Sequence, residues 1–465
     1  MFKKYIGDKA FYKKLFDIML PVLVQNVITN FVSLLDNIMV GRVGTEPMSG
    51  VAIVNQLMFV FALCVFGGLA GAGILTAQYY GKGDDEGIRN TFRAKLWIAF
   101  ASLVVFCSVF IFFGDDLISL FIHEGEEGLD LAATLRYGKS YLNIMLFQMP
   151  IFALLNVYSS TLRETGETEL PMRAGIAAVF VNLSFNYILI YGKFGAPRLG
   201  VVGAAIATLI ARIVECCIVI IGAHSRTDRN PFVTGLYRTI HVPAKLAKQI
   251  AIMGLPLLVN EFLWSGGMTT LNQVMSNRGL EVVSAENICS TVSNLFFCSF
   301  LAMGTATSII VGQLLGAGEL ERAVDEDRKL IAFSVVLSTA VGIIMAVIAP
   351  FIPRIYNTID IVKSLAVEMI IINAIMMPAN SFSNSCYFTL RSGGRVWITF
   401  LFDSVYVWVL SIPLTLFLVK GTALTIIPIY AISYGVDILK CIFGYFLVKR
   451  RAWVKNLVGG SIAEV

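Results

Sequence analysis

The sequence predicts an all-α polytopic membrane protein with twelve transmembrane helices in two parallel six-helix repeats, an N-lobe and a C-lobe. Three observations carry this prediction. Apolar runs of about eighteen or more residues recur along the chain, charged residues are scarce, and motifs of the first half return in the second half.

The composition sets the class of protein. Hydrophobic residues make up 57% of the 465 residues and charged residues only 14%, and the mean hydropathy is +0.77. Soluble domains usually contain about 25% charged residues, so this chain has too few charges to cover a surface that faces water. The net charge of +5 is spread over the loops between apolar runs. A soluble enzyme and a nucleic-acid-binding protein are therefore excluded.

Twelve apolar runs are long enough to span a bilayer as helices. An even number of spans places both termini on the same side of the membrane. The expected spans are residues 15–40, 51–77, 96–113, 135–160, 171–191, 199–223, 249–274, 283–311, 330–350, 364–390, 396–419 and 425–448.

Charge in the loops predicts the orientation. Lys and Arg gather in the N-terminus, the even-numbered loops and the C-terminus, whereas the loop at 114–134 contains six acidic residues and no Lys or Arg. Basic residues mark the cytoplasmic side, so we expect both termini in the cytoplasm and the 114–134 loop outside. The expected location is a bacterial-type cytoplasmic membrane.

The two halves of the chain share an ordered series of motifs, first offset by 235 or 236 positions and later by 228. Leu20-Pro21 returns as Leu255-Pro256, Gln78-x-x-Gly81-x-Gly83 as Gln313-x-x-Gly316-x-Gly318, Arg93 as Arg328, Met149-Pro150 as Met377-Pro378, and Thr161-Leu162-Arg163 as Thr389-Leu390-Arg391. Each half holds six spans, so both enter the membrane in the same direction. We expect an N-lobe at 1–223, a cytoplasmic linker at 224–248 and a C-lobe at 249–465, the architecture of many secondary transporters.

The sequence shows neither a nucleotide-binding loop nor a cysteine or histidine site for catalysis. Gly138-Lys139-Ser140 lacks the earlier glycine of a phosphate-binding loop, because Ala133 stands at that position. We therefore expect that the protein does not bind ATP as its energy source. The eight cysteines lie in apolar runs and the histidines His123, His224 and His241 in expected loops. We therefore expect no enzyme and no resident cofactor, with Na⁺ or H⁺ as the coupling ion.

Acidic residues within spans are the candidates for coupling, because a charge inside the bilayer is costly and is functional by default. Asp36 and Glu261 have no cation within one helical turn in the sequence, and we expect both to bind the coupling ion. Asp403 is a secondary candidate. It is expected near the cytoplasmic end of its span, where Arg391 or Arg395 would form a salt bridge with it.

Two other spans hold opposite charges three positions apart, Arg212 with Glu215 and Asp437 with Lys440. Side chains with this spacing are neighbours on one helix face. We expect each pair to neutralise itself locally.

Amides and hydroxyls supply further oxygens. Asn182 and Asn186 share one face of a helix, and with Thr208 they would make a cation cage if they lie near Asp36. Asn272, aligned with Glu261, and Asn380 are secondary candidates.

With these motifs, the chain resembles the multidrug and toxic compound extrusion (MATE) transporters over essentially its whole length. The residues that carry the resemblance are Ser33-Leu34-Leu35-Asp36-Asn37-Ile38-Met39-Val40-Gly41-Arg42-Val43-Gly44, Asn182-x-x-x-Asn186, Gly203-Ala204-Ala205-Ile206-Ala207-Thr208 and Gln313-Leu314-Leu315-Gly316-Ala317-Gly318. The resemblance implies two six-helix lobes that export organic cations and drugs in exchange for Na⁺ or H⁺.

The resemblance also assigns positions. Asp36 matches the essential acid of the first helix, and Asn182 and Thr208 match positions that help to hold a cation. The resemblance therefore implies Asp36, Asn182 and Thr208 as the ligands of a Na⁺ ion. The chain departs from the family pattern at Asn186, where many members have Asp, at Asn380, where sodium-type members have an acid, and at Glu261, which stands about one turn early.

Other functions remain as alternatives. A flippase for lipids or lipid-linked oligosaccharides, from the same superfamily, would need several basic residues around its cavity. Here only Arg212 lies deep in a span, beside Glu215. A major facilitator is disfavoured, because the loop at 81–86 lacks the basic G-x-x-x-D-R pattern that such transporters normally carry. The loop reads Gly81-Lys82-Gly83-Asp84-Asp85-Glu86. A secondary antiporter for small organic cations, acting as a monomer in the lipid bilayer by alternating access, is the favoured function.

Overall fold

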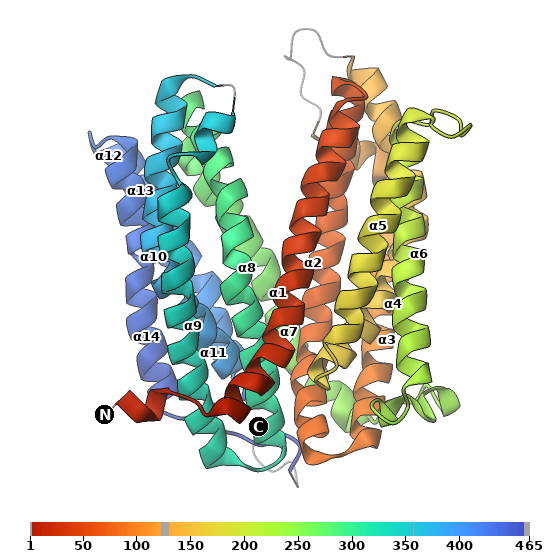
Figure 1. The fold of residues 1–465 in the computed structure, drawn as a ribbon, viewed down its shortest axis with the longest axis vertical. Coiled ribbons are helices and arrows are strands. Elements are labelled where there is room, and N and C mark those ends of the chain that lie inside the picture. Colours follow the sequence, from red (N-terminus) through yellow and green to blue (C-terminus); the bar gives the residue numbers. More distant parts are fainter. Residues whose placement is uncertain (1, 122–129, 357, 460–465) are drawn as a thin grey trace. The chain divides into compact units, whose positions relative to one another are not determined.

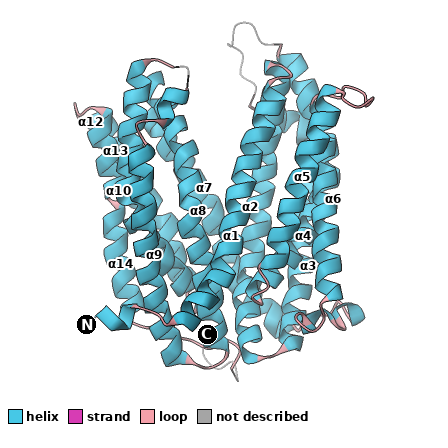
Figure 2. Cartoon of the chain, in the orientation of Figure 1, coloured by secondary structure: helices cyan, strands magenta, loops and turns pink. Residues whose placement is uncertain are grey.

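The computed structural model describes residues 2–121, 130–356 and 358–459, which form helices and connecting loops without a β-strand (Figures 1 and 2). The α-helices are α1 (Lys9–Gly41), α2 (Thr45–Lys82), α3 (Asp85–Ser119), α4 (Leu131–Glu164), α5 (Glu169–Tyr191), α6 (Val201–Ser225), α7 (Ala244–Ser276), α8 (Leu280–Gly316), α9 (Leu320–Ile348), α10 (Asp360–Ser392), α11 (Val396–Phe400), α12 (Ile412–Gly421), α13 (Ile426–Gly435) and α14 (Asp437–Lys449). The short helices are η1 (Phe2–Tyr5), η2 (Pro231–Val233), η3 (Leu236–Arg238), η4 (Ile352–Ile355), η5 (Leu401–Val405) and η6 (Val407–Ser411).

Within the described residues, twelve helical segments are long and apolar enough to cross a membrane, which confirms the predicted fold class. The eleventh segment, Val396–Gly421, joins α11 to α12 through the π-helical turns η5 and η6, and the twelfth, Ile426–Lys449, contains α13 and α14. Most helices are longer than the predicted apolar spans, because polar residues continue the helix at one or both ends. His224, expected in a loop, lies in the last turn of α6. His123 and the acids Glu124, Glu126 and Glu127 lie outside the described residues.

The chain forms two compact units. The C-unit consists of residues 1–23, 77–84 and 259–465, and the N-unit of residues 24–76 and 85–258. The helix η1 and the described residues after α14 both belong to the C-unit. The lobe and linker boundaries drawn from the sequence repeat remain a prediction.

Each unit contains part of a helix from the other half of the sequence. In the C-unit, the first half of α1 buries Leu15, Ile18 and Met19 in one apolar cluster with Met303 and Ala306 of α8. In the N-unit, the first half of α7 approaches α2 so closely that a Cβ atom on Gly71 would lie 2.5 Å from the backbone nitrogen of Gly254. Small residues permit this approach, as is usual for helix contacts in membranes.

A repeated motif makes a reciprocal contact in the C-unit. A Cβ atom on Gly81 would collide with the backbone of Gln313, and one on Gly316 would collide with the backbone of Gln78. Gln78 also accepts a hydrogen bond from the backbone of Leu457 (2.7 Å). The motif therefore recurs because glycine and glutamine of each copy pack against the other copy.

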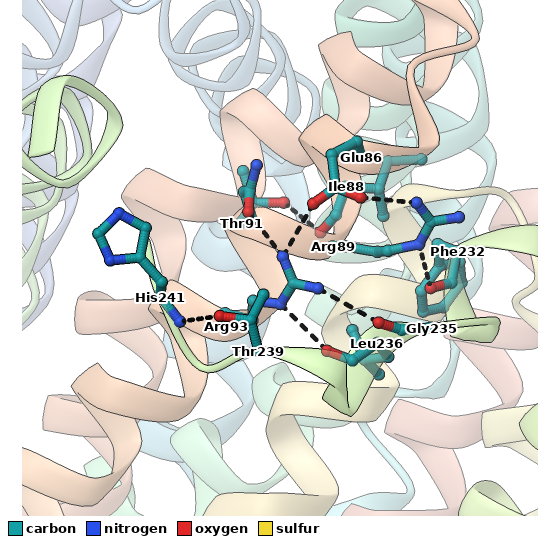
Figure 3. Close-up of polar contacts among 11 residues, drawn as sticks. Glu86, Ile88, Arg89, Thr91, Arg93, Phe232, Gly235, Leu236, Thr239 and His241 are labelled. Carbon is teal, nitrogen blue, oxygen red and sulfur yellow. Dashed lines mark hydrogen bonds and ion pairs between the residues drawn. The ribbon is translucent and has the colours of Figure 1, made fainter. Parts of the chain in front are cut away.

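Hydrogen bonds join the η2 and η3 turns of the linker to α3 of the N-unit (Figure 3). Arg93 of α3 donates to the carbonyl oxygens of Leu236 (3.0 Å) and Gly235 (3.3 Å), and Arg89 donates to that of Phe232 (3.2 Å). Phe232 and Leu236 are each only 1% exposed. The linker thus covers the first part of α3 with carbonyl oxygens and apolar side chains.

Helices α3 and α4 are joined by a buried charge pair. The fully buried Lys95 donates to Glu164 Oε2 (2.5 Å), Thr161 Oγ1 (3.0 Å) and Ser160 Oγ (3.1 Å). Glu164 in turn closely approaches Gly73 of α2. Both residues were placed in loops by the hydropathy pattern, because they lie just outside the predicted spans.

Candidate functional site

The N-unit brings four predicted residues from three helices into one hydrogen-bonded chain. Asn186 Nδ2 donates to Asp36 Oδ1 (2.7 Å) and to Asn182 Oδ1 (3.0 Å), and Asn182 Nδ2 donates to Thr208 Oγ1 (3.4 Å). Asp36 belongs to α1, the two asparagines to α5 and Thr208 to α6. The four-residue spacing on α5 places both amides on the face that meets α1 and α6.

This cluster is rich in oxygen atoms. Asn186 is 1% exposed and Asn182 is 6% exposed. Asn186 Oδ1 is buried and accepts no hydrogen bond from any residue that the structure describes. A buried acceptor without a donor is rare in folded proteins, and a bound cation would satisfy it. Together with the Asp36 carboxylate and the Thr208 hydroxyl, this oxygen has the chemistry that hard cations prefer.

The positive charge of Arg212 acts on Asp36 electrostatically. Arg212 donates to Glu215 Oε2 (2.6 Å), as predicted for this local pair, and Glu215 is 5% exposed. The arginine is thus already held by another carboxylate. Asp36 keeps an oxygen-lined environment in which a proton or a small cation can compensate its charge.

A second polar network occupies the C-unit, where η5 interrupts the regular helix. Asn260 of α7 donates to Asp403 Oδ2 (3.1 Å), and Ser404 donates to Asn260 Oδ1 (2.7 Å). Lys440 of α14 donates to Asp403 Oδ1 (2.7 Å). Local π-helical turns are frequent at functional sites. Asn260, only 1% exposed, was missed, although a polar residue in an apolar span was a usable signal.

Two predicted ion pairs are wrong. Asp403 pairs with Lys440 rather than with Arg391 or Arg395, and Lys440 therefore forms its salt bridge with Asp403 and not with Asp437. Arg395 instead donates to the carbonyl oxygen of Ala452 (2.8 Å). The physical reason is that the eleventh segment packs against α14, so partners separated by 37 positions lie closer than those on one helix.

Glu261 lies beside this network and in a different unit from Asp36, so the structure does not bring the two predicted coupling acids into one cluster. The positive charge of Arg391 and the negative charge of Asp403 both act on Glu261. The helical turn around Glu261 contains no cation, as predicted, but α10 supplies one. Glu261 is therefore part of a network of alternating charges.

The secondary amides have different surroundings. The Asn272 amide, with its nitrogen as donor, reaches Met268 O (3.2 Å) and Glu286 Oε1 (3.0 Å). Glu286 of α8 is 8% exposed and was missed by sequence reasoning, although it is an acid inside a predicted span. Asn380 is half-buried on α10 and takes no part in the described hydrogen bonds of either cluster.

The comparisons with known sequences agree with this architecture. The model of the MatE family matches residues 21–188 and 256–417, one segment in each half of the chain. Among curated relatives, "Probable multidrug resistance protein NorM" of Thermotoga maritima is 26% identical over 90% of this chain and 89% of its own. "Multidrug resistance protein MdtK" of Edwardsiella ictaluri is 25% identical, with 86% of each chain covered.

Solved structures share the fold. A structure described as an outward-facing multidrug resistance MATE family transporter of the MOP superfamily matches with a TM-score of 0.82 at 19% identity, over 97% of this chain and 98% of its own. A MOP superfamily transporter from Pyrococcus furiosus matches with a TM-score of 0.85 at 20% identity over the same shares. Because the family model covers more than half of the chain, this protein belongs to the MATE family of transporters.

Proposed function

We propose that this protein is a secondary antiporter that exports drugs and other small organic cations in exchange for Na⁺ or H⁺. It would work by alternating access, as a monomer, in a bacterial cytoplasmic membrane with both termini in the cytoplasm. The names of the curated relatives support drug export. The basic character of the even-numbered loops supports the orientation.

The observation that carries the coupling proposal is the Asp36 cluster. It joins one carboxylate to the amides of Asn182 and Asn186 and the hydroxyl of Thr208, and it leaves Asn186 Oδ1 without a donor among the described residues. A single carboxylate with neutral oxygen ligands suits a monovalent ion. Binding of Na⁺ or H⁺ would neutralise Asp36 and loosen its hydrogen bond to Asn186.

The energy that such a site can supply depends on the charge of the exported substrate. One elementary charge that moves through 100 mV provides about 2.3 kcal/mol. Since about 1.4 kcal/mol corresponds to a tenfold ratio, this energy supports a roughly fortyfold gradient of a neutral substrate. A monovalent organic cation that is exchanged for one Na⁺ or H⁺ moves no net charge, so its export would draw on the concentration gradient of the coupling ion.

The test measures ethidium movement in everted membrane vesicles with an imposed proton gradient or an imposed sodium gradient. Asp36→Asn should abolish gradient-driven transport while the protein remains inserted and monodisperse. Asp115→Asn is the matched control, because it also removes one carboxylate from the N-unit but affects an exposed pair with Lys139. The gradient that drives the control and the wild type identifies the coupling ion.

Normal ethidium efflux by the Asp36→Asn variant would refute the coupling proposal. Translocation of a fluorescent lipid, with no dye movement under either gradient, would establish the flippase alternative instead. Asn186→Asp adds the acid that many family members carry at this position. If the cluster binds the ion, this variant should change the sodium or proton dependence of transport, whereas Asp115→Asn should leave it unchanged.

A further inference from the structure

A cavity of about 700 Å³ lies in the C-unit, between η1, α9, α10, α14 and the segment that follows α14. It is separate from the networks of Asp36 and Asp403. Its lining is polar where η1 and the segment after α14 meet the first turns of α9, and apolar further along α9.

Four basic side chains line the polar end: Lys4, Arg328, Lys449 and Arg451. Among the described residues, Asp327 is the carboxylate that also lines the cavity; it is 2% exposed and accepts a hydrogen bond from Thr389 of α10. The basic residues come from η1, α9, α14 and the chain after it. The fold thus collects four separate cations around one space.

These cations are incompletely neutralised. Arg451 pairs with Glu321 at 3.0 Å and Arg328 with Asp325 at 3.5 Å, both at the rim. For the two lysines of the lining, the described residues show contacts with aromatic rings, of Tyr5 and Tyr445, and no ion pair with a carboxylate. The polar end therefore keeps an excess of positive charge.

The apolar end follows one face of α9. Beyond Arg328, Ile331, Ala332 and Val335 line the cavity over about 6 Å of helix, and Phe382 of α10 also lines it. Val336, the residue that follows Val335, is 66% exposed, so the neighbouring surface is apolar there. A ligand with an anionic head and an apolar tail would fit this space.

The sequence repeat shows what kind of group fits the basic end. The offset of 235 maps Arg89, Arg93 and Trp97 of α3 onto Val324, Arg328 and Ala332, and these three residues of α9 all line the cavity. In the N-unit, Arg89 and Arg93 donate to linker carbonyl oxygens (Figure 3). Trp97 donates to the carbonyl oxygen of Ile240, and the linker also buries apolar side chains there. In the C-unit the equivalent face borders the cavity instead.

We propose that this cavity binds an anionic glycerophospholipid of the leaflet that meets η1 and the segment after α14. Its phosphate oxygens would accept hydrogen bonds from Arg328, as the linker carbonyl oxygens do from Arg93 in the N-unit. One acyl chain would lie along α9. Basic pockets between transmembrane helices are suited to anionic headgroups. The proposal is independent of the transported substrate and of the coupling ion.

Native mass spectrometry of the purified protein, with phosphatidylglycerol or phosphatidylcholine added at equal concentration, tests the proposal. The wild type should retain one phosphatidylglycerol in preference to phosphatidylcholine. Lys4→Gln combined with Lys449→Gln should weaken phosphatidylglycerol binding roughly thirtyfold. The matched control combines Lys363→Gln with Lys420→Gln, which removes the same charge from the C-unit away from the cavity and should bind like the wild type.

Two further arms separate the source of the phosphate. Ala332→Phe fills the apolar end and should reduce lipid binding while all four cations remain. Inorganic phosphate and glycerol 3-phosphate, which lack the tail, should not displace the lipid at equal concentration. Equal binding of the two lipids, an equal loss in the Lys363/Lys420 control, or displacement by inorganic phosphate would each overturn the proposal. A melting temperature close to that of the wild type without lipid establishes that a variant is folded.

Discussion

The buried pair between Lys95 and Glu164 tests how burial determines the strength of an ion pair. The same two helices, α3 and α4, carry a second pair, Lys139 with Asp115. The nitrogen-to-oxygen distance is 2.5 Å in both pairs. Side-chain exposure is 0% and 17% in the first pair and 54% for both residues of the second.

We predict that Lys95→Met lowers the free energy of unfolding by about 3–5 kcal/mol, because it removes one partner of a buried charge pair. The two hydroxyls of Ser160 and Thr161 also lose their donor. Lys139→Met should cost less than about 1 kcal/mol, because water screens the exposed pair. With about 2–4 °C per kcal/mol for a unit of this size, the expected decreases in melting temperature are roughly 6–20 °C and below about 4 °C.

The assay heats detergent-purified protein and measures the monodisperse fraction by size-exclusion chromatography. Lys95→Met combined with Glu164→Gln should recover most of the loss, since it removes the buried negative charge together with its partner. Equal effects of Lys95→Met and Lys139→Met would contradict the prediction. So would a double variant that is as unstable as Lys95→Met alone, because the deficit would then come from packing and not from charge.

Two further predictions concern packing and the linker. Gly81→Ala should destabilise the C-unit by about 1–3 kcal/mol, because its Cβ atom would meet the backbone of Gln313. Gly435→Ala, which has open space around it, is the control and should not destabilise the C-unit. Equal melting temperatures of the two variants would show that the Gly81 contact is relaxed at no cost. Arg93→Gln should increase protease cleavage between residues 226 and 243 at least severalfold, because two linker carbonyl oxygens lose their donor. An unchanged cleavage rate would show that the apolar contacts alone hold the linker on α3.

Much of the N-unit cluster could be predicted from the sequence. The four-residue spacing of Asn182 and Asn186 requires a shared helix face, and the resemblance to a family aligned Asp36 and Thr208 with them. The contact of Asn186 with Asp36 joins positions 150 residues apart, and only the packing of α1 on α5 creates it.

The C-unit shows where sequence reasoning stops. Local spacing favoured a pair of Asp437 with Lys440, yet Lys440 pairs with Asp403 across two helices. Glu286 was overlooked because it stands near the start of a predicted span. Lys95 and Glu164 were assigned to loops because hydropathy averages over a window, whereas burial is decided residue by residue by the neighbouring helices.

The class of protein, the twelve spans and the internal repeat follow from the amino-acid order alone, because each depends on patterns along the chain: apolar length, charge scarcity and ordered recurrence. Helix packing determines which charges meet, leaves Asn186 Oδ1 without a hydrogen bond from the described residues, and places a basic cavity beside the α9 face equivalent to the linker site on α3. The difference is one of range. Helix formation and insertion into a membrane depend on neighbouring residues, whereas ion pairs and cavities arise between helices whose residues are far apart in the chain.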